Sequence, residues 1–412
     1  MSKITGGFCM HLPLEGIRII DWTQAQQGPV ATALLGDLGA DVIHVEKPVT
    51  GDIARGFMKT AGAVTGMPEG RNFYFEANNR NKRSITVNLK TEEGKKIIYR
   101  LVEKSDVFLH NMRKGVADAV ALDYKTLSNI NPKLIYCWAS GFGPVGPDSG
   151  RPGLDFAGQG QSGVMYAAGY PDMPPLPLAS GVCDQMGAVM AALGVLGALV
   201  ARERLGIGQE VNTSLLGSLL TLQGLNVTQR LWLGQKQERI NRSEARNPLW
   251  NYYQCRDGKW LILSMLGEHY WSIFCRATGL EYLERDPRFK DKDNREVNGP
   301  ALVAILDDLF GTKPRDKWIE ILCKEENLIF SVVNTMDDVI DDPQVIANKY
   351  IVDFKHPVFG PIKYFGFPVA FSKTPMAIQR EAPELGQHTE EVLLEAGYTW
   401  DEITDFREKG IF

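Results

Sequence analysis

The segment "IRIIDWTQAQQGPVATALLGDLGADVIHVE", residues 17–46, contains a complete strand–helix–strand pattern. The isoleucine-rich residues 17–21 and the apolar run at residues 40–46 are each typical of a buried strand. Residues 29–39 between them predict a helix, because a proline stands in the first turn and a glycine marks the end. Strands separated by a helix pair in parallel, so this segment predicts the start of a parallel sheet.

The same alternation continues further along the chain. Residues 84–89, 106–111 and 133–140 have strand character. Residues 91–105 form an amphipathic helical pattern with acidic residues at the start and basic residues toward the end, as a helix dipole favours. Strands alternating with helices predict an α/β fold with a doubly wound, mainly parallel sheet of the Rossmann type.

The pattern changes after residue 225. Residues 250–266 predict two strands around the turn "RDGK", and short charged helices with apolar faces follow. We therefore interpret residues 226–345 as a smaller α+β domain. The C-terminal tail predicts two short helices, the second opened by a capping box of Thr399 with Glu402.

Composition excludes several classes of protein. A formal net charge of −5 over 412 residues argues against nucleic acid or an anionic membrane as the main partner. The six cysteines have no paired spacing, which predicts no disulfide framework and no zinc site. The first residues lack the pattern of a signal peptide, and the apolar run Met186–Ala201 is short for a membrane span. We expect a soluble cytoplasmic protein.

Several kinds of active site are also disfavoured. The six histidines show no HxxxH or HxH spacing, so a histidine-rich metal site is not expected. No GxSxG elbow and no Walker loop occurs. A dinucleotide fingerprint would follow the first strand, where residues 21–31 read "DWTQAQQGPVA" instead of GxGxxG. A nicotinamide-dependent enzyme is therefore disfavoured despite the sheet.

Basic residues follow several predicted strands: Lys47, Lys90, Arg113 and Lys114. The carboxyl ends of strands in a doubly wound sheet form the ligand crevice, so these side chains are placed to converge on a polyanion such as a phosphorylated cofactor. The alternative is that they are ordinary solvated side chains at the starts of loops.

Asp184 stands in the segment "ASGVCDQMGAVMAALG", residues 179–194, at the start of a predicted helix of small and apolar residues. One interpretation is an N-cap or first-turn aspartate, which stabilises a helix by about 1 kcal/mol. The other is a carboxylate nucleophile, kept ionised by the N–H groups of the helix end and aimed by the proline-rich approach before it. The residues alone leave both open.

Six segments carry a family resemblance, running from "PLEGIRIIDWTQAQQGPVATALLGDLGADVIHVEKPVTGD" through "NRNKRSITVNLKTEEG", "NPKLIYCWASGFGPVGP", "RPGLDFAGQGQSG" and "GVCDQMGAVMAALGVLGAL" to "LGQHTEEVLLEAGY". In this order they resemble the class III CoA-transferases, the family of formyl-CoA and carnitine CoA-transferases. The resemblance implies that Asp184 attacks an acyl-CoA thioester and passes through an aspartyl anhydride and an aspartyl-CoA thioester. Coenzyme A then enters as part of the substrate, with no metal and no redox cofactor.

Other positions are similar to the family's site residues. The resemblance places Gln26 beside the catalytic aspartate, although the same residue also reads as a polar residue at a helix start. Asp155 falls where the family has a glutamate, and it reads equally as the cap of a helix at residues 156–167. The positions that match the family's CoA pocket are Lys47, Val87, Asn88, Lys90, Asn111, Met112 and Arg113, whereas Arg83 in "NKRS" is a candidate for a role in the fold.

The sequence also departs from the family pattern. The glycine-rich lid of formyl-CoA transferase is replaced by "SEARNPLWNYYQ", residues 243–254, which makes Trp250 and Tyr252 candidate contacts to the acid. A related racemase has a histidine where this chain has Leu154, so a two-base racemase lacks one base. A CoA-binding subunit with little catalysis of its own is a further alternative. The candidate substrates are succinyl-CoA as donor and a dicarboxylic or aromatic acid as acceptor.

The resemblance also implies an assembly. Family members are interlocked homodimers with a large domain built from both chain ends. In this chain that domain corresponds to residues 1–225 with 346–412, and the small domain to residues 226–345. Some members pair two different but related subunits, so a heteromer with such a subunit is the alternative.

Overall fold

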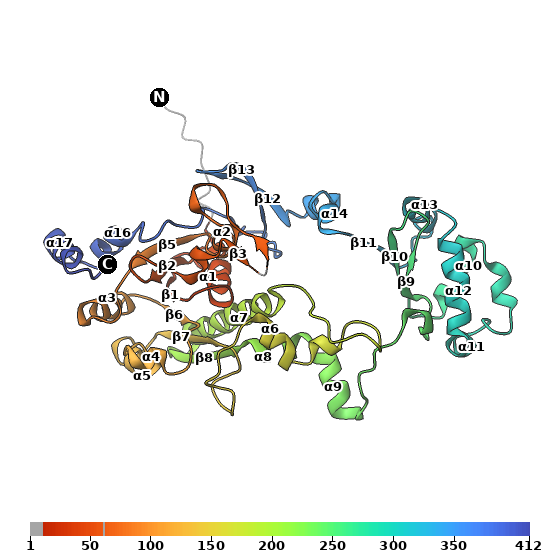
Figure 1. Cartoon of the computed structure of the whole chain (residues 1–412), viewed down its shortest axis with the longest axis horizontal. Helices are drawn as coiled ribbons and strands as arrows, with labels where there is room; N and C mark the ends of the chain where they lie inside the picture. The colour runs from red at the N-terminus through yellow and green to blue at the C-terminus, as the bar shows by residue number, and fades with distance from the viewer. Residues whose placement is uncertain (1–10, 61) are drawn as a thin grey trace. The chain divides into compact units, whose positions relative to one another are not determined.

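The computed structural model describes residues 11–60 and 62–412, and the chain divides into two compact units (Figure 1). The large unit contains the chain up to Met165, Leu176–Gln235 and Lys349–Phe412. The small unit contains Tyr166–Pro175 and Lys236–Asn348. Cys9 and most of the segment examined for a signal peptide lie outside the described residues, and the other five cysteines are free thiols.

The large unit is built on a six-stranded parallel sheet with strand order β5-β2-β1-β6-β7-β8. The predicted α/β fold with a parallel sheet is confirmed. The order reverses between β1 and β6, and ligands of such sheets bind where the order reverses, beyond the carboxyl ends of the strands. The strands are β1 (Arg18–Trp22), β2 (Asp41–Glu46), β5 (Lys82–Thr86), β6 (Val107–His110), β7 (Ile135–Ser140) and β8 (Gln209–Ser214).

Helices cover both faces of this sheet, because successive strand residues point to opposite sides. Ile19 faces a core with α1 (Gln27–Asp37) and α7 (Val182–Leu205). Ile20 faces a core with α3 (Glu92–Val102) and the C-terminal helices. These last helices are α16 (Thr389–Glu395) and α17 (Trp400–Glu408), and the predicted capping box of Thr399 with Glu402 opens α17.

An ion-pair cluster at Arg83 fixes the C-terminal segment to the sheet. The Arg83 guanidinium lies 2.7 Å from Asp41, 2.9 Å from Glu391 and 2.8 Å from Glu395. Arg80 is likewise buried against Asp37 at 2.6 Å. Arg80, just before β5, and Arg83, within it, therefore serve the fold.

The small unit has a three-stranded antiparallel sheet, in the order β11-β10-β9. Its strands are β9 (Trp250–Gln254), β10 (Trp260–Ser264) and β11 (Phe330–Val333), so the hairpin predicted around "RDGK" is confirmed. The helices α10 (His269–Thr278), α12 (Gly299–Phe310) and α13 (Arg315–Leu322) contribute the buried side chains Phe274, Leu306 and Trp318 to its core.

Shorter elements complete the two units. In the large unit they are β3 (Lys59–Thr60), β4 (Ala63–Val64), α2 (Phe73–Asn78), α4 (Val116–Ala119), α5 (Tyr124–Ile130), α6 (Asp155–Gln161), α8 (Leu215–Leu222), α9 (Gly224–Leu233), β12 (Ile351–His356) and β13 (Gly360–Phe365). In the small unit they are α11 (Lys292–Val297), α14 (Met336–Ile340) and α15 (Pro343–Ala347).

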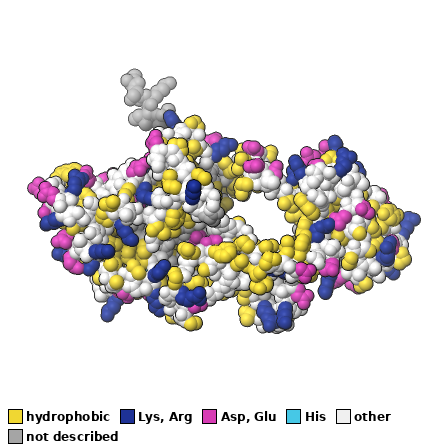
Figure 2. Space-filling view, in the orientation of Figure 1, with side chains coloured by type: hydrophobic (Ala, Val, Ile, Leu, Met, Phe, Trp, Pro, Cys, Tyr) yellow, Lys and Arg dark blue, Asp and Glu magenta, His cyan; other side chains and the backbone are white. Residues whose placement is uncertain are grey.

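Large apolar side chains are exposed on three consecutive helices of the large unit. Figure 2 shows hydrophobic side chains gathered on the surface in the region of α6 and α8. Two of the most exposed stand on α9, Leu225 at 88% and Trp232 at 82%. Exposed apolar side chains gathered on one region of a surface are typical of an interaction face. Its members are Val189, Leu193 and Val200 on α7, Leu220 and Leu222 on α8, and Leu225, Leu231, Trp232 and Leu233 on α9.

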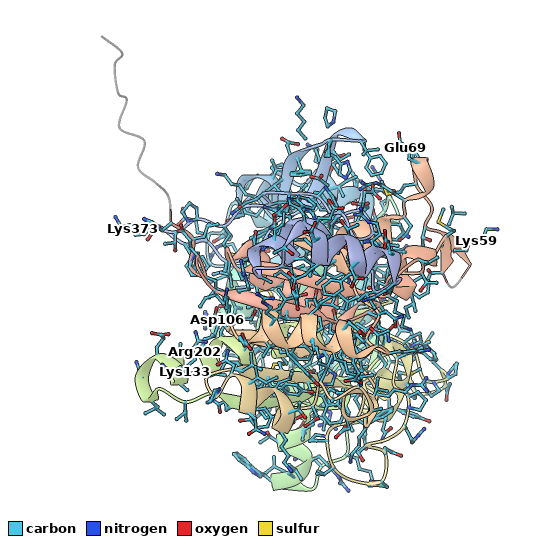
Figure 3. All side chains as sticks on the ribbon, turned by 90° about the vertical axis from the view of Figure 1, so that its left-hand side faces the viewer. Lys59, Glu69, Asp106, Lys133, Arg202 and Lys373 are labelled. Carbon is cyan, nitrogen blue, oxygen red and sulfur yellow. The ribbon has the colours of Figure 1, made fainter. Side chains whose placement is uncertain are left out.

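Helix α7 is longer than the apolar run Met186–Ala201 that the sequence singled out. It has 24 residues and, among the described helices, is the one that is long and apolar enough to cross a membrane. The length of the apolar run is therefore no argument against a membrane span. Its small residues Ala188 and Ala191 are buried against the sheet core that α7 shares with α1. Arg202 near its end pairs with Asp106, just before β6, at 2.8 Å (Figure 3). It is therefore a core helix of the large unit.

Candidate functional site

The two loops that leave the sheet at the reversal of strand order are tied together. The Asn111 side chain, just after β6, accepts from the backbone N–H of Gln24 at 2.9 Å and donates to its carbonyl at 2.8 Å. Gln24 follows β1, so this double hydrogen bond joins the β1 and β6 loops. The next turn of the chain carries Gln26 to the start of α1, at the carboxyl edge of the sheet.

Asp184 lies in the first turn of α7 and is not its N-cap. The N-cap residue is Gly181, which has φ +79° and supplies no side-chain acceptor. Asp155 supplies it instead: its Oδ1 accepts from the N–H of Cys183 at 2.7 Å and of Asp184 at 3.1 Å. The first interpretation placed Asp184 at the N-cap or in the first turn of the helix. The N-cap position is wrong, and the first-turn position is confirmed.

Asp155 does not cap its own helix either. It is the first residue of α6, whose N-cap is Leu154 without a side-chain bond, and α6 ends at Gln161 and not at residue 167. The second oxygen of Asp155 accepts from the Gln159 side chain at 2.7 Å. The side chain therefore holds α6 and the start of α7 together and places the two carboxylates side by side.

Burial and the neighbouring Asp155 charge raise the pKa of Asp184 to about 7. Its carboxylate oxygens receive no hydrogen bond from the part of the chain that the structure describes, since the free N–H groups of α7 are given to Asp155. The expectation that the helix end keeps Asp184 fully ionised is therefore wrong. A carboxylate with a raised pKa is a more basic and hence stronger nucleophile once it is ionised.

Gln26 lies against the start of α7. A Cβ built on Gly181 would stand 2.6 Å from Gln26 Nε2, so only glycine leaves room for this amide. Tyr74 in α2 donates its hydroxyl hydrogen bond to Gln26 Oε1 at 3.0 Å, which leaves the amide N–H₂ free as a donor beside Gly181, at the start of the helix that carries Asp184. Burial and the charges of Asp184, Asp52 and Asp155 raise the pKa of Tyr74. Tyr74 was missed in the sequence, where nothing around it distinguishes it from other aromatic residues.

The candidate basic residues divide into two groups. Lys47, Lys90 and Arg113 are exposed after β2, β5 and β6, and none of the three makes an ion pair with another described residue. Lys114 is engaged, because its ammonium donates to the Pro144 carbonyl at 2.9 Å and to Ser149 Oγ at 3.1 Å. Three free cations thus stand at the carboxyl edge.

The remaining candidates for the CoA pocket lie in the same loops. The Val87 side chain is buried, and the Asn88 N–H donates to the Ile411 carbonyl at 2.7 Å. The Met112 carbonyl accepts from the Trp138 indole at 2.9 Å. A cavity of about 330 Å³ opens after β6, with Arg113, Lys114, Tyr124 and Trp138 among its lining residues.

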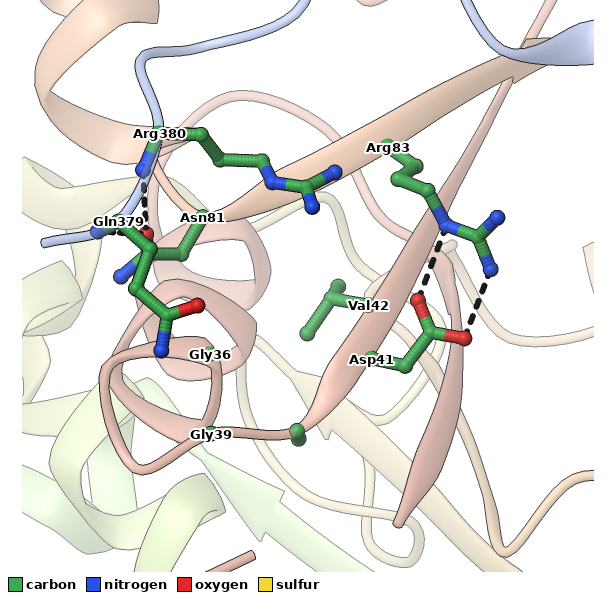
Figure 4. A pocket seen from close by; sticks show the side chains of 9 residues that line it. Gly36, Gly39, Asp41, Val42, Asn81, Arg83, Gln379 and Arg380 are labelled. Carbon is green, nitrogen blue, oxygen red and sulfur yellow. Dashed lines mark hydrogen bonds and ion pairs between the residues drawn. The ribbon is translucent and has the colours of Figure 1, made fainter. Parts of the chain in front are cut away.

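A second cavity of the large unit, about 180 Å³, lies away from these residues (Figure 4). Gly39 and Asp41 at the amino end of β2 line it together with Arg83 and Arg380, and the Arg83–Asp41 ion pair forms part of its wall. It contains no predicted site residue. Within residues 11–60 and 62–412, no group of three or more His, Cys, Asp and Glu side chains is arranged to hold a metal ion.

The candidate acid contacts Trp250 and Tyr252 belong to the small unit. Both point outward from β9, and the Tyr252 hydroxyl lies 2.9 Å from that of Tyr170. A cavity of about 370 Å³ in the same unit is lined in part by Arg246, Leu249 and Met265.

Comparison with known proteins identifies the family. The sequence model of CoA-transferase family III matches residues 14–389. An acyl-CoA transferase of Fusarium pseudograminearum is 34% identical over 97% of this chain and 88% of its own length. The succinyl-CoA:glutarate CoA-transferase of Mus musculus is 32% identical over 93% of this chain and 86% of its own. A CaiB/BaiF family protein from Brucella suis superposes with a TM-score of 0.80 at 30% identity, over 94% of this chain and all of its own.

The chain therefore belongs to CoA-transferase family III, as the resemblance predicted. It is an enzyme that transfers CoA between acyl-CoA thioesters and carboxylic acids.

Proposed function

We propose that Asp184 is the nucleophile of this transfer. The observation that carries the proposal is the contact between Asp155 and the first turn of α7, which holds a half-buried carboxylate with a raised pKa at the carboxyl edge of the sheet. Asp184 has no competing hydrogen bond from the described residues, so an incoming carbonyl carbon meets an unoccupied oxygen. Gln26 is within reach of the same place.

The reaction balances with Asp184 alone as the covalent group. The ionised carboxylate attacks the donor thioester, the C–S bond breaks, and an aspartyl anhydride and CoA thiolate form. The thiolate attacks the aspartyl carbonyl, releasing the donor acid and leaving an aspartyl-CoA thioester. The acceptor carboxylate attacks this thioester, its C–S bond breaks, and a second anhydride and CoA thiolate form. Thiolate attack on the acceptor carbonyl of that anhydride releases the new acyl-CoA and the Asp184 carboxylate.

Three further side chains have assigned roles in this proposal. The Gln26 amide N–H₂ donates to the oxyanion that develops in each attack, and Tyr74 fixes that amide with its donor end free. Asp155 orients the first turn of α7 and, through its charge, raises the pKa of Asp184. None of the three carries a covalent intermediate.

CoA binds in this proposal along the β2, β5 and β6 loops. Lys47, Lys90 and Arg113 are free to pair with its phosphates, which carry several negative charges. Val87, Asn88, Asn111 and Met112 line the path from those charges toward Gln26. The cavity beside Arg113 supports this placement.

We propose succinyl-CoA as the donor and a small dicarboxylic acid as the acceptor. The relatives with names of this kind include succinyl-CoA:glutarate CoA-transferase and succinyl-CoA–D-citramalate CoA-transferase. An aromatic acid is the second candidate, since another relative is a cinnamoyl-CoA:phenyllactate CoA-transferase. The alternative of a racemase is not supported, because the leucine side chain at position 154 has no atom that can accept a proton and act as the second base.

We further propose that the enzyme is cytoplasmic and works as an interlocked homodimer. The exposed apolar residues of α7, α8 and α9 support a partner that covers this face. In this proposal the partner is a second copy of the chain. A related second subunit is the alternative partner.

The decisive experiment incubates the enzyme with succinyl-CoA and hydroxylamine and then maps the adduct by peptide mass spectrometry. A hydroxamate on Asp184 in the wild-type chain and none in Asp184→Asn is the expected result. Incorporation of solvent deuterium at the α-carbon of the acyl group without CoA exchange would establish the racemase instead.

A further inference from the structure

We propose that Asp52 is a positioning residue for this reaction: it holds Ala25 in a left-handed conformation and thereby aims Gln26 at Asp184. The inference rests on the proposed function, because it assigns Asp52 an effect on the Asp184 chemistry. Asp52 is 4% exposed and acts through the backbone of the β1–α1 loop without touching substrate.

The loop before Gln26 is strained at a single residue. Ala25 has φ +66°, a left-handed conformation that residues other than glycine rarely adopt. Asp52 Oδ1 accepts from the Ala25 N–H at 3.0 Å and from the Ala54 N–H at 2.9 Å. One carboxylate oxygen therefore clamps the strained residue to the 3₁₀ turn Ile53–Gly56. A different φ at Ala25 would swing the Gln26 side chain away from Gly181.

A buried charge network fixes the clamp from behind. Asp52 Oδ2 lies 3.8 Å from His44 Nε2, both side chains are fully buried, and neither atom has a hydrogen-bond partner among the described residues. The other ring nitrogen of His44 lies 3.0 Å from Asp21, whose Oδ2 also accepts from Lys82 Nζ at 2.9 Å. The attraction of His44 for Asp52 Oδ2 leaves Oδ1 as the oxygen that faces Ala25.

The backbone of Asp52 is fixed as well. Its N–H donates to Glu46 Oε2 at 2.9 Å, and Glu46 is held by Arg55 at 2.7 Å and by Ser84 Oγ at 2.6 Å. The groups that act on the Asp52 carboxylate include the charges of His44 and Glu46 in β2 and of Lys82 in β5, besides the N–H groups of Ala25 and Ala54. Asp52 has little freedom to move, so the length of its side chain determines where Ala25 is held.

Two substitutions separate the position of the oxygen from its charge. Asp52→Asn keeps an acceptor at Oδ1 and removes the charge, whereas Asp52→Glu keeps the charge and displaces the acceptor by one bond. We expect Asp52→Glu to lower kcat by about tenfold or more, with the KM for succinyl-CoA changed less than about twofold, because a misplacement of 1 Å is costly. Asp52→Asn retains kcat within about threefold.

Three measurements accompany kcat. The rate of Asp184 hydroxamate formation should fall with kcat in Asp52→Glu. Hydrogen–deuterium exchange of the peptide that contains Ala25 should be faster in Asp52→Glu than in Asp52→Asn. Thermal melting of both is compared with Thr399→Ala, which removes the exposed cap of α17 in the same unit and provides a purely structural control.

The outcomes are distinct. Equal activity in both Asp52 variants, equal loss in both, or a larger loss in Asp52→Asn overturns the positioning role. If the wild-type chain forms no adduct at Asp184, the proposed function fails instead, whatever the Asp52 variants do. Should Asp52→Glu not fold, Asp52→Ser takes its place with the same expected loss, because its hydroxyl ends one bond short of Ala25.

Discussion

Asp155 caps the helix that carries Asp184, and it does so from another helix. One oxygen of Asp155 accepts two backbone N–H groups of α7, one of them that of Asp184 itself. The contact fixes where Asp184 stands and sets its charge. A carboxylate at a free helix end would lose its proton readily, but burial and, to a lesser extent, the charge of Asp155 raise the pKa of Asp184 to about 7.

Asp184→Asn should lower kcat by roughly 10³-fold or more, since a covalent nucleophile is removed. The same substitution should raise stability at pH 8. The pKa of Asp184 is raised from its ordinary value of 3.8 to about 7 in the folded chain. Between these values the unfolded chain is ionised at this group and the folded chain is not, so the free energy of unfolding falls as the pH rises. This penalty grows from about pH 4 to pH 7 and is complete above it, and asparagine has none.

Thermal melting at two pH values checks the stability effect. Asp184→Asn should melt above the wild-type chain at pH 8 and together with it near pH 4. A lower melting temperature of Asp184→Asn at pH 8 would contradict the raised pKa.

The pH profile of kcat/KM for succinyl-CoA should rise on an acid limb near pH 7, where Asp184 loses its proton. Asp155→Asn keeps an acceptor for the two N–H groups of α7 and removes only the charge. Its limb should move to lower pH, because the like charge that contributes to the raised pKa of Asp184 is gone while burial, the larger cause, remains. Asp405→Asn, which removes a half-buried carboxylate on α17 that pairs with Lys409, should leave the limb in place. An unmoved limb in Asp155→Asn would refute the coupling.

The sequence predicted the strands and helices whose signals lie within a short stretch of the chain. The β1–α1–β2 segment was readable because the apolar periods, the proline and the glycine all lie within 30 residues. Strand β8 was not predicted, because its residues "QEVNTS" are mostly polar. They lie at the edge of the sheet, where they are half-buried or exposed and none is fully buried. Its place depends on pairing with β7.

The site shows the same division. The sequence and the family resemblance together named Asp184, Gln26 and Asp155. The cap of α7 could not be read from the sequence, because it comes from a residue 29 positions away and the contact depends on how α6 packs. Tyr74 and Asp52 were missed for the same reason: their roles depend on contacts with Gln26 and Ala25 that the strand order creates.

Gly181→Ala should lower kcat by about 10²-fold, because the new Cβ would stand 2.6 Å from Gln26 Nε2 and displace the amide. Gly206→Ala is its matched control. Gly206 ends the same helix with a similar φ of +75°, but a Cβ there meets nothing within 4 Å. Both variants should lose comparable stability from backbone strain, and only Gly181→Ala should lose activity. Equal kcat in the two variants would rule out the placement of Gln26.

We expect three single variants to raise the KM for acyl-CoA severalfold and to leave kcat unchanged: Lys47→Ala, Lys90→Ala and Arg113→Ala. Each loses a contact to a phosphate, which contributes roughly 0.5–1.5 kcal/mol to the binding free energy. The KM of the wild-type chain should rise with salt, and that of the triple variant should rise less, because screening weakens the phosphate contacts. Lys95→Ala, which removes a lysine paired with Glu92 on α3, is the control. Unchanged KM values in all three variants would place CoA elsewhere.

The exposed face of α7, α8 and α9 predicts an assembly of twice the 45.8 kDa chain mass in light scattering. An interlocked dimer differs from an ordinary one in how its chains exchange, since neither chain can leave without unfolding. Folded tagged and untagged enzyme should therefore form no hybrid dimers on mixing at any dilution. Refolding the mixture from denaturant should give hybrids in about half of the dimers, the statistical share of random pairing. Hybrids that appear on simple mixing would show a dimer that is not interlocked, and a monomer in light scattering would assign this face to a different, related subunit.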